Sequence, residues 1–199
     1  MSEILDPSHT ALVLWDIQNG LVNTAFNKEV FLQKTKEITA AARAVNIPVI
    51  YTKITPLPVQ YQSPWRLFTL MRRAGVDSPD KLPPFMEIGS PQAEIEASLT
   101  PHRTDLVLNK YSYSIFVGTH FEGMMRNTGI NTLLFTGIAT EIGIAASAMD
   151  SSSRGFYTIV VEDCVSSSDA EMHNSMLKIL NKMSLVMPSE SIIKEWRGI

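Results

Sequence analysis

Two charged side chains and one glycine stand where runs of apolar residues end, and their types suggest acid–base chemistry. Asp16 follows an apolar run at 11–15, Lys110 ends the run at 105–110, and Gly143 lies in "GIATEIGIAAS" at 137–147. A carboxylate that is partly buried where a strand meets its loop has a raised pKa, which makes it an acid or base near neutral pH. A lysine that ends a buried strand can hold this negative charge or stabilise a developing anion.

The local pattern leaves ordinary alternatives open for both charged residues. An aspartate after a strand commonly forms a turn or caps a helix, so Asp16 has a structural interpretation as well as a chemical one. A lysine at a strand end commonly extends its ammonium group into water, and the same holds for Lys110.

The turn at 137–147 predicts a strand that passes directly into a helix N-terminus, a place where many enzymes carry a Ser or Cys nucleophile. Gly143 occupies the position that the pattern indicates as buried. We expect its missing side chain to leave open space, in which backbone N–H groups and the helix dipole hold a water or an anion. Glu141 is either a residue that the helix dipole favours in the first turn or a second acid or base.

The elements that must position these residues follow from alternating patterns. Continuous apolar runs, typical of strands buried on both faces, lie at 11–16, 47–52, 105–110, 131–137, 157–163 and 184–188. Helical spacing of apolar residues lies between them, at 28–46, 119–129, 140–155 and 169–183. This alternation predicts an α/β fold, a doubly wound three-layer sandwich with a six-stranded, mainly parallel sheet.

Ligands of such sheets bind outside the carboxyl ends of the strands. We therefore expect one edge to carry Asp16, Lys53, Lys110, the turn at 137–143, and Asp163 with Cys164 after the fifth strand. Residues 54–100 interrupt the alternation and contain seven of the chain's 11 prolines. We interpret them as a long insertion that shapes or covers the site, within a single domain spanning residues 1–199.

Composition limits the class of protein. The net charge of −3 comes with scattered basic residues, which gives no electrostatic footprint for nucleic acid. No segment approaches the roughly 20 apolar residues that span a bilayer, and no basic segment followed by an apolar one marks a secretory leader, so we expect a cytoplasmic protein without membrane partners. One cysteine excludes an internal disulfide, and four histidines without ligand spacing predict no zinc, other metal or cofactor.

Three stretches taken together resemble the signature regions of the isochorismatase-like hydrolase superfamily, which includes nicotinamidases, N-carbamoylsarcosine amidases and isochorismatases. They are "WDIQNG" at 15–20, "KYSYSIF" at 110–116 and the turn that begins at 137, and "VVEDCVSSSDAEMHNSML" extends the similarity. The resemblance implies a Rossmann-like fold in which Asp16 and Lys110 are catalytic. It also implies that Ile138 and Ala139 are joined by a cis peptide that aims backbone N–H groups into the site, and that Gly143 stands where the amidases carry their nucleophilic cysteine.

Isochorismatases are similar to this chain in having glycine at that position, and they cleave a vinyl ether through a protonated aspartate and water. The resemblance thus implies a cysteine-independent hydrolase that breaks a vinyl ether, C–N or C–O bond of a small anionic molecule by Asp/Lys acid–base catalysis. Its substrate pocket is expected to include Gln18, Arg66, Phe116 and Glu141. A small-molecule-binding protein that retained the pocket without the chemistry is the alternative.

Two further expectations concern the lone thiol and the assembly. Cys164 has nothing basic nearby in sequence to activate it, so we interpret it as an ordinary semi-buried cysteine, with a catalytic role as the alternative. His173 is expected on a helix with a structural partner. The family resemblance and the apolar, methionine-bearing helices predict a homodimer or a higher closed homo-oligomer.

Overall fold

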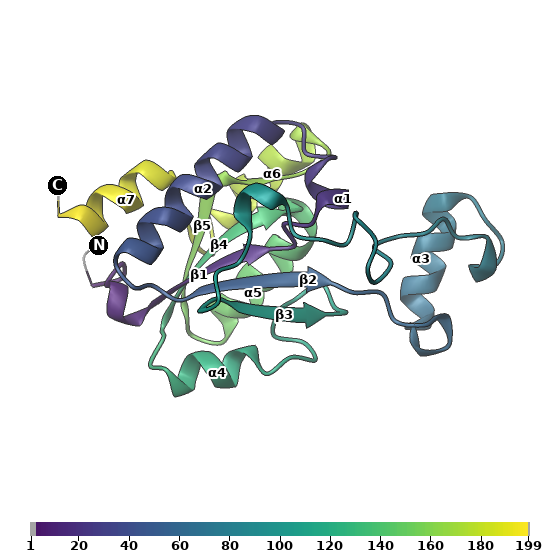
Figure 1. Cartoon of the computed structure of the whole chain (residues 1–199), viewed down its shortest axis with the longest axis horizontal. Helices are drawn as coiled ribbons and strands as arrows, with labels where there is room; N and C mark the ends of the chain where they lie inside the picture. The colour runs from purple at the N-terminus through teal and green to yellow at the C-terminus, as the bar shows by residue number, and fades with distance from the viewer. Residues whose placement is uncertain (1–2, 199) are drawn as a thin grey trace.

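The centre of the protein is a six-stranded sheet in which every neighbouring pair of strands is parallel (Figure 1). The computed structural model describes residues 3–198. The strand order is β3-β2-β1-β4-β5-β6. The strands are β1(Thr10–Trp15), β2(Val49–Ile54), β3(Leu106–Lys110), β4(Thr132–Ile138), β5(Tyr157–Ser166) and β6(Leu185–Met187). The predicted α/β class is confirmed, and the sheet is wholly rather than mainly parallel.

Helices cover both faces of the sheet, which explains the continuous apolar strands. On one face, α2(Lys28–Ala44) and α7(Ser189–Arg197) pack in a core cluster that includes Leu12 and Leu14 of β1. On the other face, α4(Phe121–Asn127), α5(Ala145–Ser153) and α6(Ala170–Leu180) pack in a second cluster that includes Val13 and Trp15. Successive residues of β1 therefore enter different cores, so the stretch from Ala11 to Trp15 is apolar throughout.

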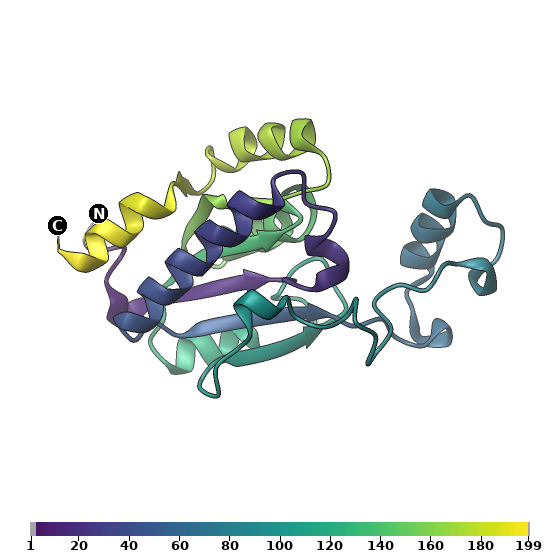
Figure 2. The ribbon, with the colours of Figure 1, turned by 45° about the horizontal axis from the view of Figure 1, so that its top comes forward.

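The insertion between β2 and β3 projects from the body of the molecule as a lobe (Figures 1 and 2). It contains α3(Pro64–Ala74), a helix that the proline-rich pattern did not predict. Ser63 caps this helix by accepting the Arg66 N–H, Pro64 occupies its first turn, and Gly75 ends it at φ 67°. The short α1(Asn19–Val22) and the C-terminal α7 were likewise not predicted.

The fifth strand is longer than its apolar run predicts, and this corrects the placement of two residues. The register against β4 shifts between the pairs Phe135–Val160 and Gly137–Val165, so β5 accommodates extra residues and continues to Ser166. Asp163 and Cys164 thus lie inside the strand rather than in a loop after it. The Asp163 carboxylate accepts hydrogen bonds from Ser189 N (2.8 Å) and Oγ (2.7 Å) at the start of α7.

Lys53 is also inside a strand, β2, rather than after it, and its Nζ lies 3.7 Å from a carboxylate oxygen of Glu94. No helix within residues 3–198 has the length and apolar character needed to cross a bilayer.

The parallel pairing of β1 with β4 requires glycine at position 137, opposite Trp15. Gly137 has φ 115°, and a Cβ there would overlap the carbonyl oxygen of Trp15 and come within 2.7 Å of its backbone nitrogen. Backbone atoms in the middle of a sheet cannot rotate away, so the close approach of the two strands depends on a missing side chain.

We expect Gly137→Ala to lower the free energy of unfolding by about 3 kcal/mol or more, because backbone overlap adds to the strain of a positive φ. Gly155→Ala is the matched control, since Gly155 has φ 79° and open space around its Cβ position. Urea unfolding of both variants checks this, and equal losses would show that strain alone, without overlap, sets the requirement.

Candidate active site

Asp16 is held rigidly just beyond the end of β1. It has φ 47°, a left-handed conformation that is uncommon outside glycine and is tolerated best by Asn and Asp. Its backbone N–H donates to Thr52 Oγ1 (3.0 Å), and that hydroxyl donates to Asp16 Oδ1 (2.6 Å). Thr52 lies on the neighbouring β2 and is fully buried. The carboxylate is thereby oriented with Oδ2 free for another partner.

That partner is Lys110, which ends β3 two strands away from β1. Two strand spacings are roughly 10 Å, so only a long side chain reaches across β2 to the end of β1. Lys110 Nζ donates to Asp16 Oδ2 at 2.6 Å, and the exposed fractions of the Lys110 and Asp16 side chains are 2% and 5%. The ammonium group also lies 4.1 Å from the centre of the Trp15 ring. The structure thus brings together the two residues that the strand-end pattern singled out.

Burial shifts the pKa of each member of this pair toward its neutral form. Desolvation raises the pKa of Asp16 and outweighs the attraction of Lys110. Desolvation likewise lowers the pKa of Lys110 despite the adjacent carboxylate. Both shifts narrow the free-energy gap between the ion pair and the neutral pair, in which the proton lies on Asp16 rather than on Lys110.

The turn after β4 lies against Trp15. The Ile138–Ala139 peptide is cis, and the chain then forms a π-helical turn, Thr140–Ile144, which leads into α5. A Cβ at Gly143 would overlap Nε1 and Cε2 of the Trp15 indole and come within 2.7 Å of its Cζ2. The expectation of open space at Gly143 is therefore wrong, because the indole fills it.

Arg66 of α3 is the predicted pocket residue whose charge acts on both Asp16 and Lys110. Its Nη1 donates to the carbonyl oxygen of Tyr111 (2.8 Å), the residue that follows Lys110. Its positive charge contributes to the pKa values of both Asp16 and Lys110 by lowering them. Arg66 also lines a hollow of about 850 Å³ in the lobe, together with apolar residues such as Leu57, Leu67 and Leu70.

Gln18 is a structural clamp in this structure rather than a free pocket residue. Its Oε1 accepts the Ile54 N–H (2.8 Å), and its Nε2 donates to the carbonyls of Ala93 (2.8 Å) and Ile54 (3.2 Å). Both amide protons are thus used by the protein. The clamp joins β1, β2 and the returning end of the insertion, and it fixes the loop that follows Asp16.

Phe116, which was also predicted to line the substrate pocket, packs in the apolar core. Its ring lies 5.3 Å from that of Phe121 and 5.9 Å from that of Phe156, within the apolar cluster on the α4 and α5 face. The apolar residues around it explain this position, because an aromatic side chain at a loop start buries more surface in the core than in a polar pocket.

Glu141 faces the loop after β5. Its Oε1 accepts from Ser167 Oγ (2.8 Å), whereas its buried Oε2 has no hydrogen-bond partner within the described part of the chain. His173, on α6 as expected, has its Nδ1 2.8 Å from Thr140 Oγ1. These contacts tie the π-helical turn to the β5–α6 region.

Cys164 is fully buried in the core cluster beneath α2 and α7. Burial raises the pKa of its thiol well above the ordinary value, and the neighbouring Asp163 charge acts in the same direction. A thiol of this kind is inert, because the reactive species is the thiolate.

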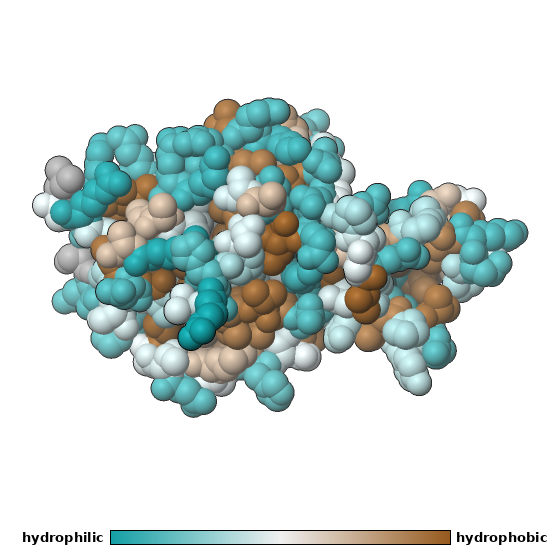
Figure 3. All heavy atoms as spheres, viewed as in Figure 1, coloured by the Kyte–Doolittle hydropathy of each residue, from teal (hydrophilic) through white to brown (hydrophobic). Residues whose placement is uncertain are grey.

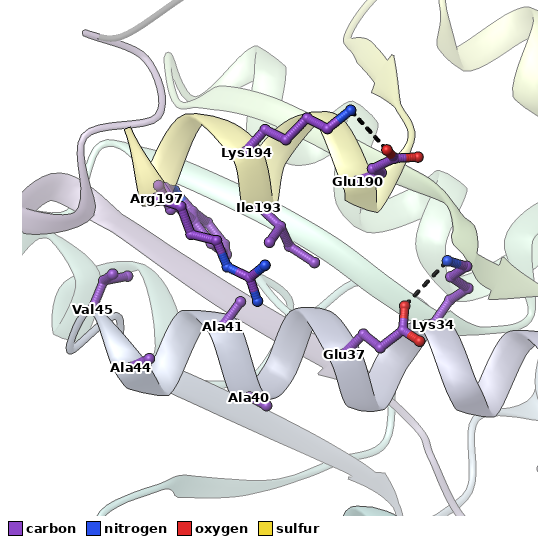
Figure 4. A pocket seen from close by; sticks show the side chains of 11 residues that line it. Lys34, Glu37, Ala40, Ala41, Ala44, Val45, Glu190, Ile193, Lys194 and Arg197 are labelled. Atoms are coloured by element: carbon purple, nitrogen blue, oxygen red, sulfur yellow. Dashed lines mark hydrogen bonds and ion pairs between the residues drawn. The ribbon is translucent and has the colours of Figure 1, made fainter. Parts of the chain in front are cut away.

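A hollow of about 570 Å³ between α2 and α7 lies apart from this chemistry (Figure 4). Alanines of α2 and apolar residues of α7 line it, and the ion pairs Lys34–Glu37 and Lys194–Glu190 flank it. None of the strand-end residues takes part. Among residues 3–198, no group of three or more His, Cys, Asp or Glu side chains is placed to hold a metal ion.

Comparison with known sequences shows which family this chain resembles. The isochorismatase domain model matches residues 10–191. Ureidoacrylate amidohydrolase RutB of Methylobacterium radiotolerans is 28% identical over 193 residues, covering 87% of this chain and 73% of the relative. The uncharacterized isochorismatase family protein YecD of Escherichia coli is 27% identical over 193 residues, covering 95% of this chain and 97% of the relative.

Solved structures share the fold. A cysteine hydrolase from Pseudomonas syringae superposes with a TM-score of 0.84 at 19% identity, covering 97% of this chain and 94% of that one. An isochorismatase family protein from Burkholderia thailandensis gives 0.78 at 25% identity, covering 96% of each chain. The chain belongs to the isochorismatase family. Within it, the protein is a hydrolase of the isochorismatase type.

Two residues of the site were not predicted from the sequence. Thr52 is a polar residue inside the apolar run at 47–52, and this exception was its only signal. Trp15 was counted as part of an apolar strand, and its size next to Asp16 was the signal available.

We expect Lys110→Met to lower the free energy of unfolding at neutral pH by about 3–5 kcal/mol, because Asp16 is left buried without its cation. The double variant Asp16→Asn/Lys110→Met should lose less, since no buried charge remains. With the Asp16 pKa raised above its ordinary value of 3.8, the stability of Lys110→Met is greatest below that pH and falls as pH rises through the folded-state pKa.

Urea unfolding of the single and double variants at several pH values measures this difference, which should grow from acid to neutral pH. Equal stabilities of the two variants at every pH would contradict a buried charge at Asp16.

Proposed function

We propose that this protein is a cysteine-independent hydrolase in which Asp16 is the proton donor and Lys110 is its charge partner. The observation that carries the proposal is the buried 2.6 Å contact between Lys110 Nζ and Asp16 Oδ2. A purely structural role explains it poorly, because a buried ion pair is often less favourable than apolar residues of similar volume. An acid–base pair with pKa values shifted toward each other is what proton-transfer catalysis requires.

The proposal assigns Gly143 the position at which amidases of this family carry a cysteine. Without a thiolate, no acyl-enzyme forms there, and water must attack the substrate directly. For a vinyl ether, Asp16 donates a proton to the terminal alkene carbon and water adds to the oxocarbenium carbon that results. The added water returns one proton to Asp16, and the hemiacetal then collapses to a carbonyl compound and an alcohol.

The same groups would catalyse the hydrolysis of a C–N bond. Asp16 then protonates the leaving nitrogen while water attacks the carbonyl carbon, and the water proton restores the acid. The name of one relative, ureidoacrylate amidohydrolase, describes a substrate with such a bond and a carboxylate. We therefore include small ureido and amide compounds among the candidate substrates.

The proposed substrate is a small anion because the site is flanked by cationic groups. Lys110 lies at the strand end, and Arg66 sits above it on α3, anchored to the Tyr111 carbonyl. The buried Arg66 Nε has no hydrogen-bond partner within the described residues. The Arg66 guanidinium would pair with a substrate carboxylate, while the apolar hollow that Arg66 lines takes the rest of the molecule.

A cytoplasmic location and assembly into a homo-oligomer are proposed as well, and the lobe supports the assembly. Between residues 55 and 90, only Met86 is buried. Figure 3 shows hydrophobic atoms on the lobe, and its large exposed apolar side chains are Val59, Tyr61, Trp65, Phe68, Phe85 and Ile88. Light scattering at micromolar concentration should return at least a dimer mass, and a monomer mass throughout this range would contradict the proposal.

Replacing Asp16 with Asn should lower the hydrolytic rate by at least about 100-fold, because the proton donor is lost. With wild type, the rate should fall as pH rises through the raised Asp16 pKa, since the protonated form is the acid. A screen of small anionic vinyl ethers, amides and ureas supplies the substrate for this assay.

Cys164→Ser is the matched control and should retain the wild-type rate, as should wild type treated with an alkylating reagent. Activity that alkylation abolishes in wild type but not in Cys164→Ser would overturn the cysteine-independent mechanism. If the protein binds a ligand without turnover, and Asp16→Asn leaves the affinity unchanged, the alternative of a small-molecule-binding protein without catalysis would hold instead.

A further inference from the structure

The indole of Trp15 lies between two parts of the site that are distant in sequence. Its edge is against Gly143, where Nε1, Cε2 and Cζ2 are the three nearest atoms to the position of a missing Cβ. Its face is toward Lys110, whose Nζ is 4.1 Å from the ring centre. The side chain is 1% exposed and packs in the apolar cluster on the α4 and α5 face.

Space alone explains the glycine at position 143. Its φ lies outside the left-handed region, so its backbone accepts any L-residue. Gly123 in α4 provides the contrast, because its φ also lies outside that region and nothing lies within 4 Å of its Cβ position. A substitution at Gly123 therefore meets open space, whereas the same change at Gly143 meets the buried indole of Trp15.

We propose that Trp15 and Gly143 form a sterically coupled pair. The indole of Trp15 occupies the volume that a side chain at position 143 would need, so this turn cannot carry a nucleophilic side chain. The ring that excludes this side chain also supports the Lys110 ammonium through its negative π face. Trp15 is thus a positioning residue that commits the site to Asp16 and Lys110. Its importance for catalysis rests on the proposed function, but the steric coupling does not.

The coupling has a consequence for any thiol placed in this turn. Gly143→Cys alone must displace the indole, and the thiol then has no settled position. Replacing Trp15 with a smaller strand-forming residue frees the volume, and the thiol lies near the Lys110 ammonium, which lowers a thiol pKa. A reactive cysteine at 143 therefore requires two substitutions rather than one.

A double-mutant cycle on stability tests the steric part without any substrate. Gly143→Ala in the otherwise native chain should lower the folded-to-unfolded ratio by about 10- to 100-fold, as overpacking does. In a Trp15→Ile background the same substitution should be neutral or should raise the ratio, because Ala is preferred over Gly in a helix. Gly123→Ala should be neutral or favourable in both backgrounds.

Urea unfolding of both backgrounds, each with and without Gly143→Ala or Gly123→Ala, gives these folded-to-unfolded ratios. Should Trp15→Ile fail to fold, Trp15→Phe, which removes the pyrrole edge with Nε1, gives the same comparison. The expected result is a loss from Gly143→Ala that disappears or reverses in the Trp15→Ile background, with no such difference between backgrounds for Gly123→Ala. The coupling is overturned if Gly143→Ala has the same effect in both backgrounds or is tolerated as well as Gly123→Ala.

Thiol labelling tests the chemical part in chains that carry Cys164→Ala, so that position 143 holds the sole thiol. The combination Trp15→Ile/Gly143→Cys should react with iodoacetamide at neutral pH at least about 10-fold faster than the same chain with Lys110→Met added, because the ammonium favours the thiolate. Equal labelling rates would remove Lys110 from the neighbourhood of position 143. Neither readout depends on turnover, so a failure here is distinguishable from a failure of the proposed hydrolase activity.

Discussion

The site depends on one buried contact, the hydrogen-bonded pair of Asp16 and Lys110 at the carboxyl edge of the sheet. The two residues come from strands separated by β2, so the pair forms only when β1, β2 and β3 are in register. Thr52 on the intervening strand fixes one carboxylate oxygen, and Lys110 takes the other. Because removal of either charge leaves the other unsatisfied in a desolvated place, folding and chemistry rest on the same contact.

Trp15 connects this pair to the turn that follows β4. Its backbone passes so close to Gly137 that a Cβ would overlap it, and its indole meets Gly143, six residues further along the chain. The backbone of residue 15 therefore explains the glycine at position 137, and the indole of Trp15 explains the glycine at position 143. The steric arrangement agrees with a mechanism in which water, rather than a protein nucleophile, attacks the substrate.

Much of the architecture could be predicted because parallel strands buried on both faces are continuous apolar runs. The same logic singled out Asp16 and Lys110, since each is a charged residue at the end of such a run. Contacts between distant segments left no comparable signal. The register shift that carries β5 past Cys164, the use of both Gln18 amide protons, and the core position of Phe116 depend on neighbours that no local pattern reveals. The indole beside Gly143 is the clearest example, because a missing side chain suggests open space until its neighbour is known.

The central claim is that burial makes Asp16 easier to protonate than an exposed aspartate, as the proposed role of proton donor requires. Carbon-13 NMR of the aspartate carboxyl groups, with Asp16→Asn to assign the resonance, measures its titration directly. The account predicts a midpoint above the ordinary value of 3.8, because desolvation outweighs the attraction of Lys110. A midpoint at or below that value would show that burial does not favour the protonated form, and would contradict the proposed role of Asp16 as proton donor.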